Sequence, residues 1–120
     1  MQNHNVLIVE DEILIGLELR DVLLDAGARV VGPAMSVAEA LRLIDNEKPT
    51  AAIVDVNLGS EVALPVAQRL EAAAVPFVLH TGNLANGLPH GWPRVPVVIK
   101  PAPSHAVISA LIAVLPEVKP

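Results

Sequence analysis

The chain has 120 residues, with 13 Asp or Glu against 8 Lys or Arg, so its formal net charge is −5 with neutral histidine. This length predicts one domain. The acidic balance and the scattered bases argue against nucleic acid or an anionic membrane as a partner, because both attract clustered Lys and Arg. Hydrophobic residues make up 52% of the sequence, which excludes a disordered chain, and the lack of cysteine excludes disulfides and zinc–thiolate sites.

The sequence supports neither export from the cell nor insertion into a membrane. The amino terminus lacks the basic and apolar regions of a secretory signal peptide. The uncharged stretch between Glu71 and Arg94 contains three prolines and three glycines, which makes a membrane-spanning helix untenable. We therefore expect a cytoplasmic protein that forms a single domain over residues 1–120, without an output domain.

Short apolar runs and helical patterns alternate from the amino terminus onward. Residues 6–9 form a continuous apolar run, as in a strand buried on both faces. Residues 13–26 carry apolar side chains at helical spacing, and residues 29–34 form a second predicted strand. Ser36 and Glu39 then have the spacing of a capping box at the start of a second helix.

The second half repeats this alternation with one interruption. Three further strands are predicted at residues 51–54, 77–79 and 97–99. Pro65 fits the first turn of a third helix, and Ser104 is expected to cap a last helix that Pro116 ends. Residues 82–96 hold three prolines and three glycines, so the helix expected there is short, irregular or mobile. The alternation predicts a doubly wound α/β fold with a five-stranded parallel sheet.

Charged and hydroxyl groups follow the predicted strands where each of them ends, namely Glu10, Asp11, Asp55, Thr81 and Lys100. In open α/β sheets the functional site lies beyond the carboxyl ends of the strands. Carboxylates about 4 Å apart repel by roughly 4 kcal/mol per pair at an effective dielectric of 20. A hard cation such as Mg²⁺, together with the lysine, would offset that repulsion. Taken singly, each residue also fits an ordinary loop, turn or surface role.

The order of these residues resembles that of bacterial response-regulator receiver domains (CheY-like), the phosphoacceptor domains of two-component signalling. The resemblance covers essentially the whole chain and implies a flavodoxin-like sheet with strand order 2-1-3-4-5. Residues 75–82, VPFVLHTG, are also similar to the signature of the single-domain FATGUY subgroup, whose fourth helix is degraded. Val97 departs from the family pattern, because an aromatic switch residue commonly stands there, and Glu10 replaces the commoner aspartate.

The resemblance implies a role for each of the strand-end residues. Asp55 would accept a phosphoryl group from a sensor histidine kinase or a phosphotransfer protein. Thr81 and Lys100 would bind the phosphoryl oxygens. The ligands of a Mg²⁺ ion would be Glu10, directly or through water, Asp11, Asp55 and the main-chain carbonyl of Asn57.

The function implied is that of a stand-alone response regulator that signals by protein–protein contact. Apart from a slow hydrolysis of its own acyl phosphate, such a protein is not expected to be an enzyme. One alternative is a pseudo-receiver that serves as a scaffold without phosphorylation. A Mg²⁺-dependent phosphohydrolase with an aspartate nucleophile is a further alternative, disfavoured because Asn57 stands where such enzymes carry a second aspartate. His80 is open to a structural or a site-tuning role, and Trp92 to tethering its loop or anchoring a partner.

Overall fold

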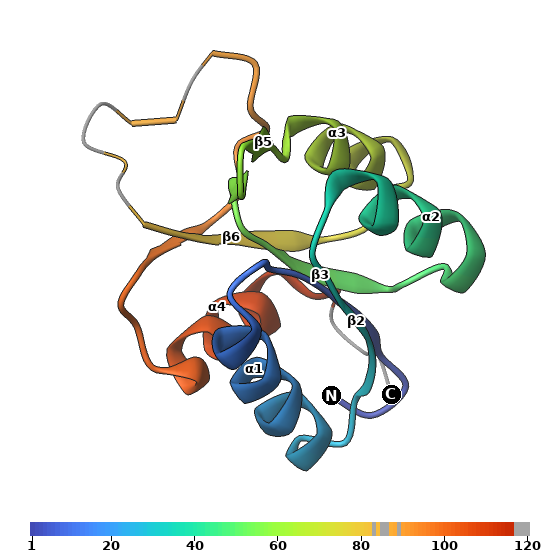
Figure 1. Ribbon diagram of the computed structural model, residues 1–120. Helices are drawn as coiled ribbons and strands as arrows, with labels where there is room; N and C mark the ends of the chain where they lie inside the picture. Colours follow the sequence, from blue (N-terminus) through green and yellow to red (C-terminus); the bar gives the residue numbers. More distant parts are fainter. Residues whose placement is uncertain (83, 85–86, 89, 117–120) are drawn as a thin grey trace.

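The computed structural model describes residues 1–82, 84, 87–88 and 90–116 of the chain. Its centre is a parallel sheet of five strands, in the spatial order β2-β1-β3-β6-β7 (Figure 1). Their bounds are β1 Asn5–Val9, β2 Arg29–Ala34, β3 Ala51–Val54, β6 Phe77–Thr81 and β7 Val97–Ile99. Counted along the chain without the small hairpin described below, this is the order 2-1-3-4-5, and the predicted doubly wound fold is confirmed.

Helices cover both faces of this sheet (Figure 1). One face carries α1 (Ile13–Asp25) and α4 (Ser104–Val114), and the other carries α2 (Val37–Glu47) and α3 (Leu64–Ala72). The helices α1, α2 and α3 each join two parallel strands, as right-handed crossovers do, whereas α4 follows the last strand. Among the described residues, no helix combines the length and the apolar character that crossing a membrane requires.

The side chains of each strand alternate between the two faces of the sheet, and this divides the core into two clusters. Leu7 and Val54 belong to the cluster beneath α2 and α3, whereas Ile8 and Ile53 belong to the cluster beneath α1 and α4. Successive side chains of a strand point to opposite faces, so strands covered on both sides consist almost entirely of apolar residues. The continuous apolar runs of the sequence are explained by this two-sided burial. Val6–Val9 and Ala51–Val54 are all buried, as predicted.

The helix starts agree with the predictions at α2 and differ at α4. The Ser36 hydroxyl accepts a hydrogen bond from the Glu39 amide at 3.2 Å, and the Glu39 carboxylate accepts one from the Met35 amide at 3.0 Å. The predicted cap of α2 is therefore present. Ser104 was expected to cap the last helix, but it is the first residue of α4, and Pro103 occupies the capping position without a side-chain hydrogen bond. That prediction is wrong by one residue. The backbone is still extended at Pro103 and becomes helical at Ser104, so Pro103 is the last residue before the helix.

A small antiparallel hairpin, β4 (Asn57–Leu58) and β5 (Glu61–Val62), was not predicted. It stands between β3 and α3 and begins two residues after Asp55. Gly59 has a positive φ of 60° in its turn, a conformation that glycine adopts without steric cost. Two residues per strand are too few to leave a periodic signal in the sequence.

The segment between β6 and β7 contains no helix in the part that the structure describes. This agrees with the prediction of a degraded fourth helix, although residues 83, 85–86 and 89 of that segment lie outside the described residues. Leu88, Trp92 and Val95 are partly buried and pack against the core cluster beneath α2 and α3. Trp92 therefore contacts the domain itself, which favours tethering of the loop over an exposed anchor.

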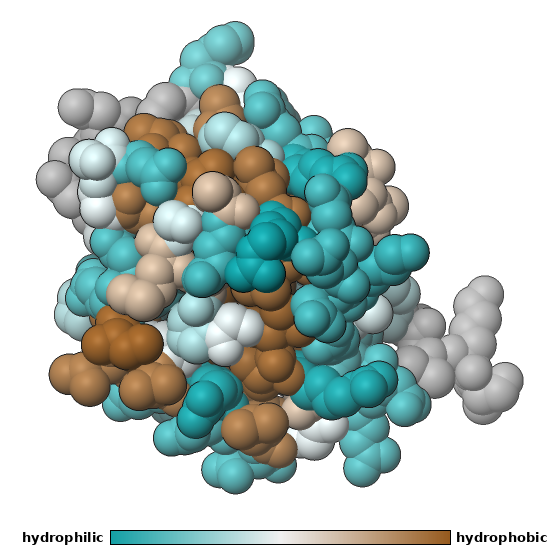
Figure 2. Space-filling model, turned by 45° about the vertical axis from the view of Figure 1, so that its right-hand side comes forward, coloured by the Kyte–Doolittle hydropathy of each residue, from teal (hydrophilic) through white to brown (hydrophobic). Residues whose placement is uncertain are grey.

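Large apolar side chains are also exposed at several places on the surface. Leu14 at the start of α1 is 77% exposed, and Ile13 and Met35 are close to half exposed. Figure 2 shows one face of the molecule, on which hydrophobic groups interrupt a largely hydrophilic surface.

Candidate functional site

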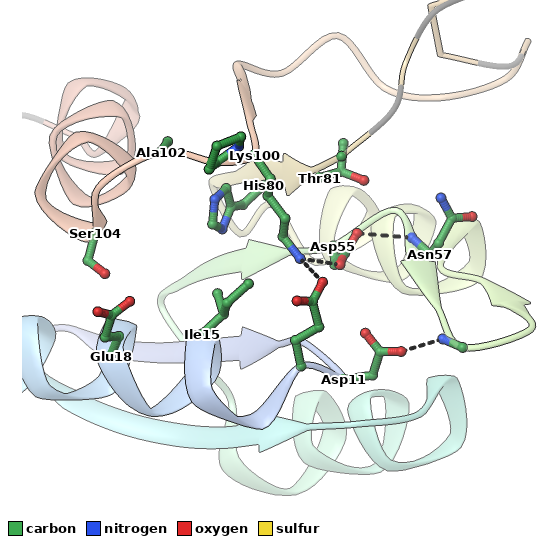
Figure 3. A pocket seen from close by; sticks show the side chains of 14 residues that line it. Asp11, Ile15, Glu18, Asp55, Asn57, His80, Thr81, Lys100, Ala102 and Ser104 are labelled. Atoms are coloured by element: carbon green, nitrogen blue, oxygen red, sulfur yellow. Dashed lines mark hydrogen bonds and ion pairs between the residues drawn. The ribbon is translucent and has the colours of Figure 1, made fainter.

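The strand-end residues are held in place by backbone hydrogen bonds that continue the sheet beyond its strands. The Glu10 amide donates to the Ala34 carbonyl at 2.8 Å, and the Asp55 amide donates to the Val9 carbonyl at 2.9 Å. The Lys100 amide donates to the Thr81 carbonyl at 2.8 Å. The sheet therefore fixes the Cα positions of these residues at one edge, where Figure 3 shows the side chains of Asp55 and Lys100 meeting.

Three carboxylates gather at this edge, and one ammonium group contacts two of them. Glu10, Asp11 and Asp55 each offer an oxygen, and these atoms lie within 4.8 Å of one another. The Lys100 Nζ lies 2.6 Å from Glu10 Oε1 and 2.8 Å from Asp55 Oδ2. Glu10 and Asp55 are buried, so their charges are only weakly screened by water. The structure thus brings together four of the residues singled out from the sequence.

Glu12 joins this cluster from the start of α1. Its carboxylate lies 3.1 Å from the Lys100 Nζ, although its side chain is 61% exposed. The contact with Lys100 was missed, because it joins residues at opposite ends of the chain. An exposed ion pair of this kind contributes only about 0–1 kcal/mol.

The two buried acids respond to this environment in opposite directions. Burial, reinforced by the Asp55 carboxylate, raises the pKa of Glu10 above its usual range. Burial alone would also raise the pKa of Asp55, but its contacts with Glu10 and Lys100 outweigh burial and lower that pKa. Burial opposes the charge of Lys100 too, yet the bonds to Asp55 and Glu10 prevail and raise its pKa. Asp55 is thereby kept ionised, as a nucleophilic carboxylate must be.

Several buried polar atoms at this edge find no hydrogen-bond partner among the described residues. These atoms are Glu10 Oε2, Thr81 Oγ1 and both ring nitrogens of His80. A buried polar atom without a partner costs about 1–3 kcal/mol. Glu10 Oε2 and Thr81 Oγ1 both belong to side chains at the acidic cluster, so an ion and an anionic group arriving there would give them partners. The donor set of carboxylate oxygens also fits a hard cation such as Mg²⁺.

The loop after β3 approaches the acids from the other side. The Asn57 amide donates to Asp55 Oδ1 at 3.2 Å, and the Gly59 amide donates to Asp11 Oδ2 at 2.6 Å (Figure 3). From the sequence, Asn57 was expected to contribute its main-chain carbonyl, whereas Gly59 was not expected to reach the site. The only sequence signal for Gly59 is a glycine within a turn close to Asp55, which is too common a pattern to indicate a contact with Asp11.

An open cavity of about 670 Å³ gives access to these groups. Asp11, Asp55, Thr81 and Lys100 line it, and it continues along Ile15 of α1 and other residues towards the start of α4. Figure 3 shows these side chains from close by, with Lys100 reaching across to Asp55. The volume is sufficient for a side chain or a small molecule carrying a phosphoryl group to reach Asp55.

His80 lies beside this cluster on the strand that carries Thr81. The alternation of β6 places its side chain on the same sheet face as Val78, which packs beneath α1 and α4. Its ring is buried, with 4% exposed. Burial and the nearby Lys100 charge lower the pKa of His80, so the neutral imidazole is favoured.

Comparisons with known proteins agree with the fold and with the site. No family model matches the chain. The solution structure of SdrG from Sphingomonas melonis Fr1 is 37% identical over 91% of this chain and 96% of that one, with a TM-score of 0.75. The response regulator PhyR from Brucella abortus is 28% identical over 92% of this chain and 46% of that one, with a TM-score of 0.74.

A curated relative, the transcriptional regulatory protein PdtaR from Mycobacterium tuberculosis, is 34% identical over 77 residues, or 63% of this chain. The matches span only 24% to 38% of the curated relatives' own lengths. The chain belongs to the family of response-regulator receiver domains, as the resemblance in the sequence implied.

Proposed function

We propose that this receiver domain accepts a phosphoryl group on Asp55 and signals through protein–protein contact. The observation that carries the proposal is the arrangement of Asp55, an ionised and nearly buried carboxylate, beside two further acids and one lysine. A scaffold would gain nothing from this arrangement, because the acids repel one another. The cluster is favourable only if it serves to bind positive charge and then an anionic group.

The metal proposed for this site is Mg²⁺, held by Glu10, Asp11, Asp55 and the main-chain carbonyl of Asn57. When bound, the ion would neutralise part of the acidic charge and allow an anionic phosphoryl group to approach Asp55. The unpartnered Glu10 Oε2 and the proximity of the three carboxylates support this assignment.

The residues of the chain then have distinct parts in the transfer. A carboxylate oxygen of Asp55 attacks the phosphorus of a phosphohistidine, and the bond between phosphorus and the imidazole nitrogen of the donor breaks. Lys100 would shift one of its hydrogen bonds from Glu10 to a phosphoryl oxygen. The Thr81 hydroxyl, which has no partner among the described residues, would donate to another. Such positioning and charge neutralisation account for most of the catalysis of phosphoryl transfer.

The proposed donor is a sensor histidine kinase or a phosphotransfer protein, and the product is a signalling state. The acyl phosphate adds about −1.5 to −2 charge at the sheet edge, which changes the surface that a downstream protein meets. SdrG, which is 40% identical in a second structure, has been solved in a BeF₃-activated conformation. Because BeF₃ mimics a phosphoryl group on a carboxylate, that structure supports activation at Asp55. We propose a cytoplasmic location, where such kinases consume ATP, and no enzymatic action on other substrates.

The test is phosphorylation by acetyl phosphate, followed by intact mass spectrometry of wild type, Asp55→Asn and Asp21→Asn. Asp21 is an exposed acid on α1 and serves as the matched control. We expect wild type and Asp21→Asn to gain one phosphoryl group that hydroxylamine removes, and Asp55→Asn to gain none. Labelling of Asp55→Asn would overturn the assignment of the acceptor. Failure of wild type both to be labelled and to bind Mg²⁺ would instead favour the pseudo-receiver.

A further inference from the structure

The β4–β5 hairpin is anchored at two points by contacts with different parts of the domain. On one side the Gly59 amide donates to Asp11 Oδ2 at 2.6 Å. On the other side Glu61 Oε1 accepts a hydrogen bond from the amide of Val37 at 3.3 Å. Asp11 belongs to the acidic cluster, and Val37 is the first residue of α2. The hairpin therefore connects the proposed metal site to the start of a helix.

The contact of Glu61 with α2 is favourable for two physical reasons. The first amides of a helix have no partner within the helix, and the Ser36 hydroxyl serves only the Glu39 amide. The Val37 amide is thus left for the Glu61 carboxylate to satisfy. The positive end of the helix dipole also attracts a carboxylate. In the part of the chain that the structure describes, no lysine or arginine forms an ion pair with Glu61. Its carboxylate instead accepts the hydrogen bond from α2.

The register of the hairpin transmits this contact towards Asp55. Glu61 pairs with Leu58, and Val62 pairs with Asn57. Asn57 in turn donates its amide to Asp55 Oδ1. With only two residues in each strand, the hairpin contributes little stability of its own. Its position depends on the burial of Leu58 in the core and on the anchors at Gly59 and Glu61.

We infer that Glu61 is a positioning residue for the metal site: by holding the hairpin against the start of α2, it fixes the loop in which Asn57 and Gly59 face the acidic cluster. This inference rests on the proposed function, since it concerns the affinity of that site for Mg²⁺. Linkage makes the effect reciprocal, so an ion bound at Asp11 changes the environment of the Val37 amide through Gly59 and Glu61.

The experiment is a titration of the ¹⁵N-labelled protein with MgCl₂, followed by amide resonances in wild type, Glu61→Ala, Glu61→Gln and Glu71→Ala. Glu71 is an exposed glutamate on α3 and controls for loss of a carboxylate remote from the hairpin. Glu61→Gln removes the charge but keeps an oxygen that can accept from Val37. We expect the Asn57 and Gly59 amides to shift in every variant, and the Val37 amide to shift in all except Glu61→Ala. The Mg²⁺ dissociation constant of Glu61→Ala should rise about fivefold, the effect of one lost hydrogen bond.

Each outcome separates this inference from the function on which it rests. If Gly59 and Asn57 of wild type do not respond to Mg²⁺, the proposed metal site itself is wrong. If they respond but Glu61→Ala binds Mg²⁺ as tightly as Glu71→Ala, the inference about Glu61 is overturned. If Glu61→Gln loses as much affinity as Glu61→Ala, the charge alone acts at a distance, and the positioning role is likewise refuted.

Discussion

Replacement of Lys100 by methionine tests the electrostatics of the site most severely. The change keeps much of the apolar stem and removes the ammonium group that contacts Glu10, Asp55 and Glu12. The side chains of Lys100, Glu10 and Asp55 are only 12%, 2% and 8% exposed. Glu10 and Asp55 would therefore remain buried beside each other without a compensating positive charge.

The expected loss of stability follows from this burial. Removing one partner of a buried ion pair costs about 3–5 kcal/mol, whereas the exposed contact with Glu12 adds about 0–1 kcal/mol. Protonation of Glu10, whose pKa is already raised to about 8, limits the penalty. We expect a net loss of about 3–4 kcal/mol in the absence of metal. A domain of this size has about 6–18 kcal/mol in total and stays folded.

Urea denaturation in EDTA at neutral pH measures this loss directly. Lys48→Met is the control, because Lys48 is exposed at the end of α2 and pairs with no acid among the ion pairs of the described residues. We expect the control to change stability by less than about 0.5 kcal/mol, and Mg²⁺ to restore part of what Lys100→Met loses. Equal stability of Lys100→Met and wild type in EDTA would refute the argument that Lys100 neutralises a buried acidic pair.

Three further predictions concern His80, Gly16 and Ser36. Because the pKa of His80 is lowered by burial in the folded state, the unfolded chain takes up the proton first as the pH falls below about 6.5, and wild type loses stability there. In thermal unfolding, His80→Leu should therefore lose less stability than wild type between about pH 7 and 5. Parallel plots of stability against pH for the two proteins would contradict this. Gly16→Ala places a Cβ 2.7 Å from Pro33 Cγ and should cost about 1–3 kcal/mol in urea unfolding; an unchanged midpoint would show that α1 can shift. Ser36→Ala removes the cap of α2 and should cost about 1 kcal/mol by the same assay, a loss that would be absent if solvent replaced the hydroxyl.

The sequence predicted the sheet and the strand-end residues because these depend on local patterns. A buried parallel strand is a short apolar run, and its last residue lies at the functional edge whatever the helices do. Asp55 and Lys100 could therefore be assigned to one edge although they are far apart in the chain. The order of the strands came from the family resemblance, and the structure confirms it.

The contacts that were missed depend on distances that no local pattern encodes. Glu12 reaches Lys100 from the opposite end of the chain, and Glu61 of the hairpin reaches Val37 at the start of α2. The burial of His80 follows from its face of β6, but its lack of hydrogen-bond partners depends on which side chains surround it in the fold. Ser104 was misassigned because a serine near a helix start is a capping signal whether or not a neighbouring residue takes that position.

The proposed phosphorylation of this receiver domain requires a metal held by its acidic cluster. The most direct measurement is the intact mass of wild type after incubation with acetyl phosphate, once with Mg²⁺ and once with EDTA. We predict a single phosphoryl adduct with Mg²⁺ and none with EDTA. An adduct of equal yield in EDTA would contradict the role assigned to Glu10, Asp11 and Asp55 as metal ligands.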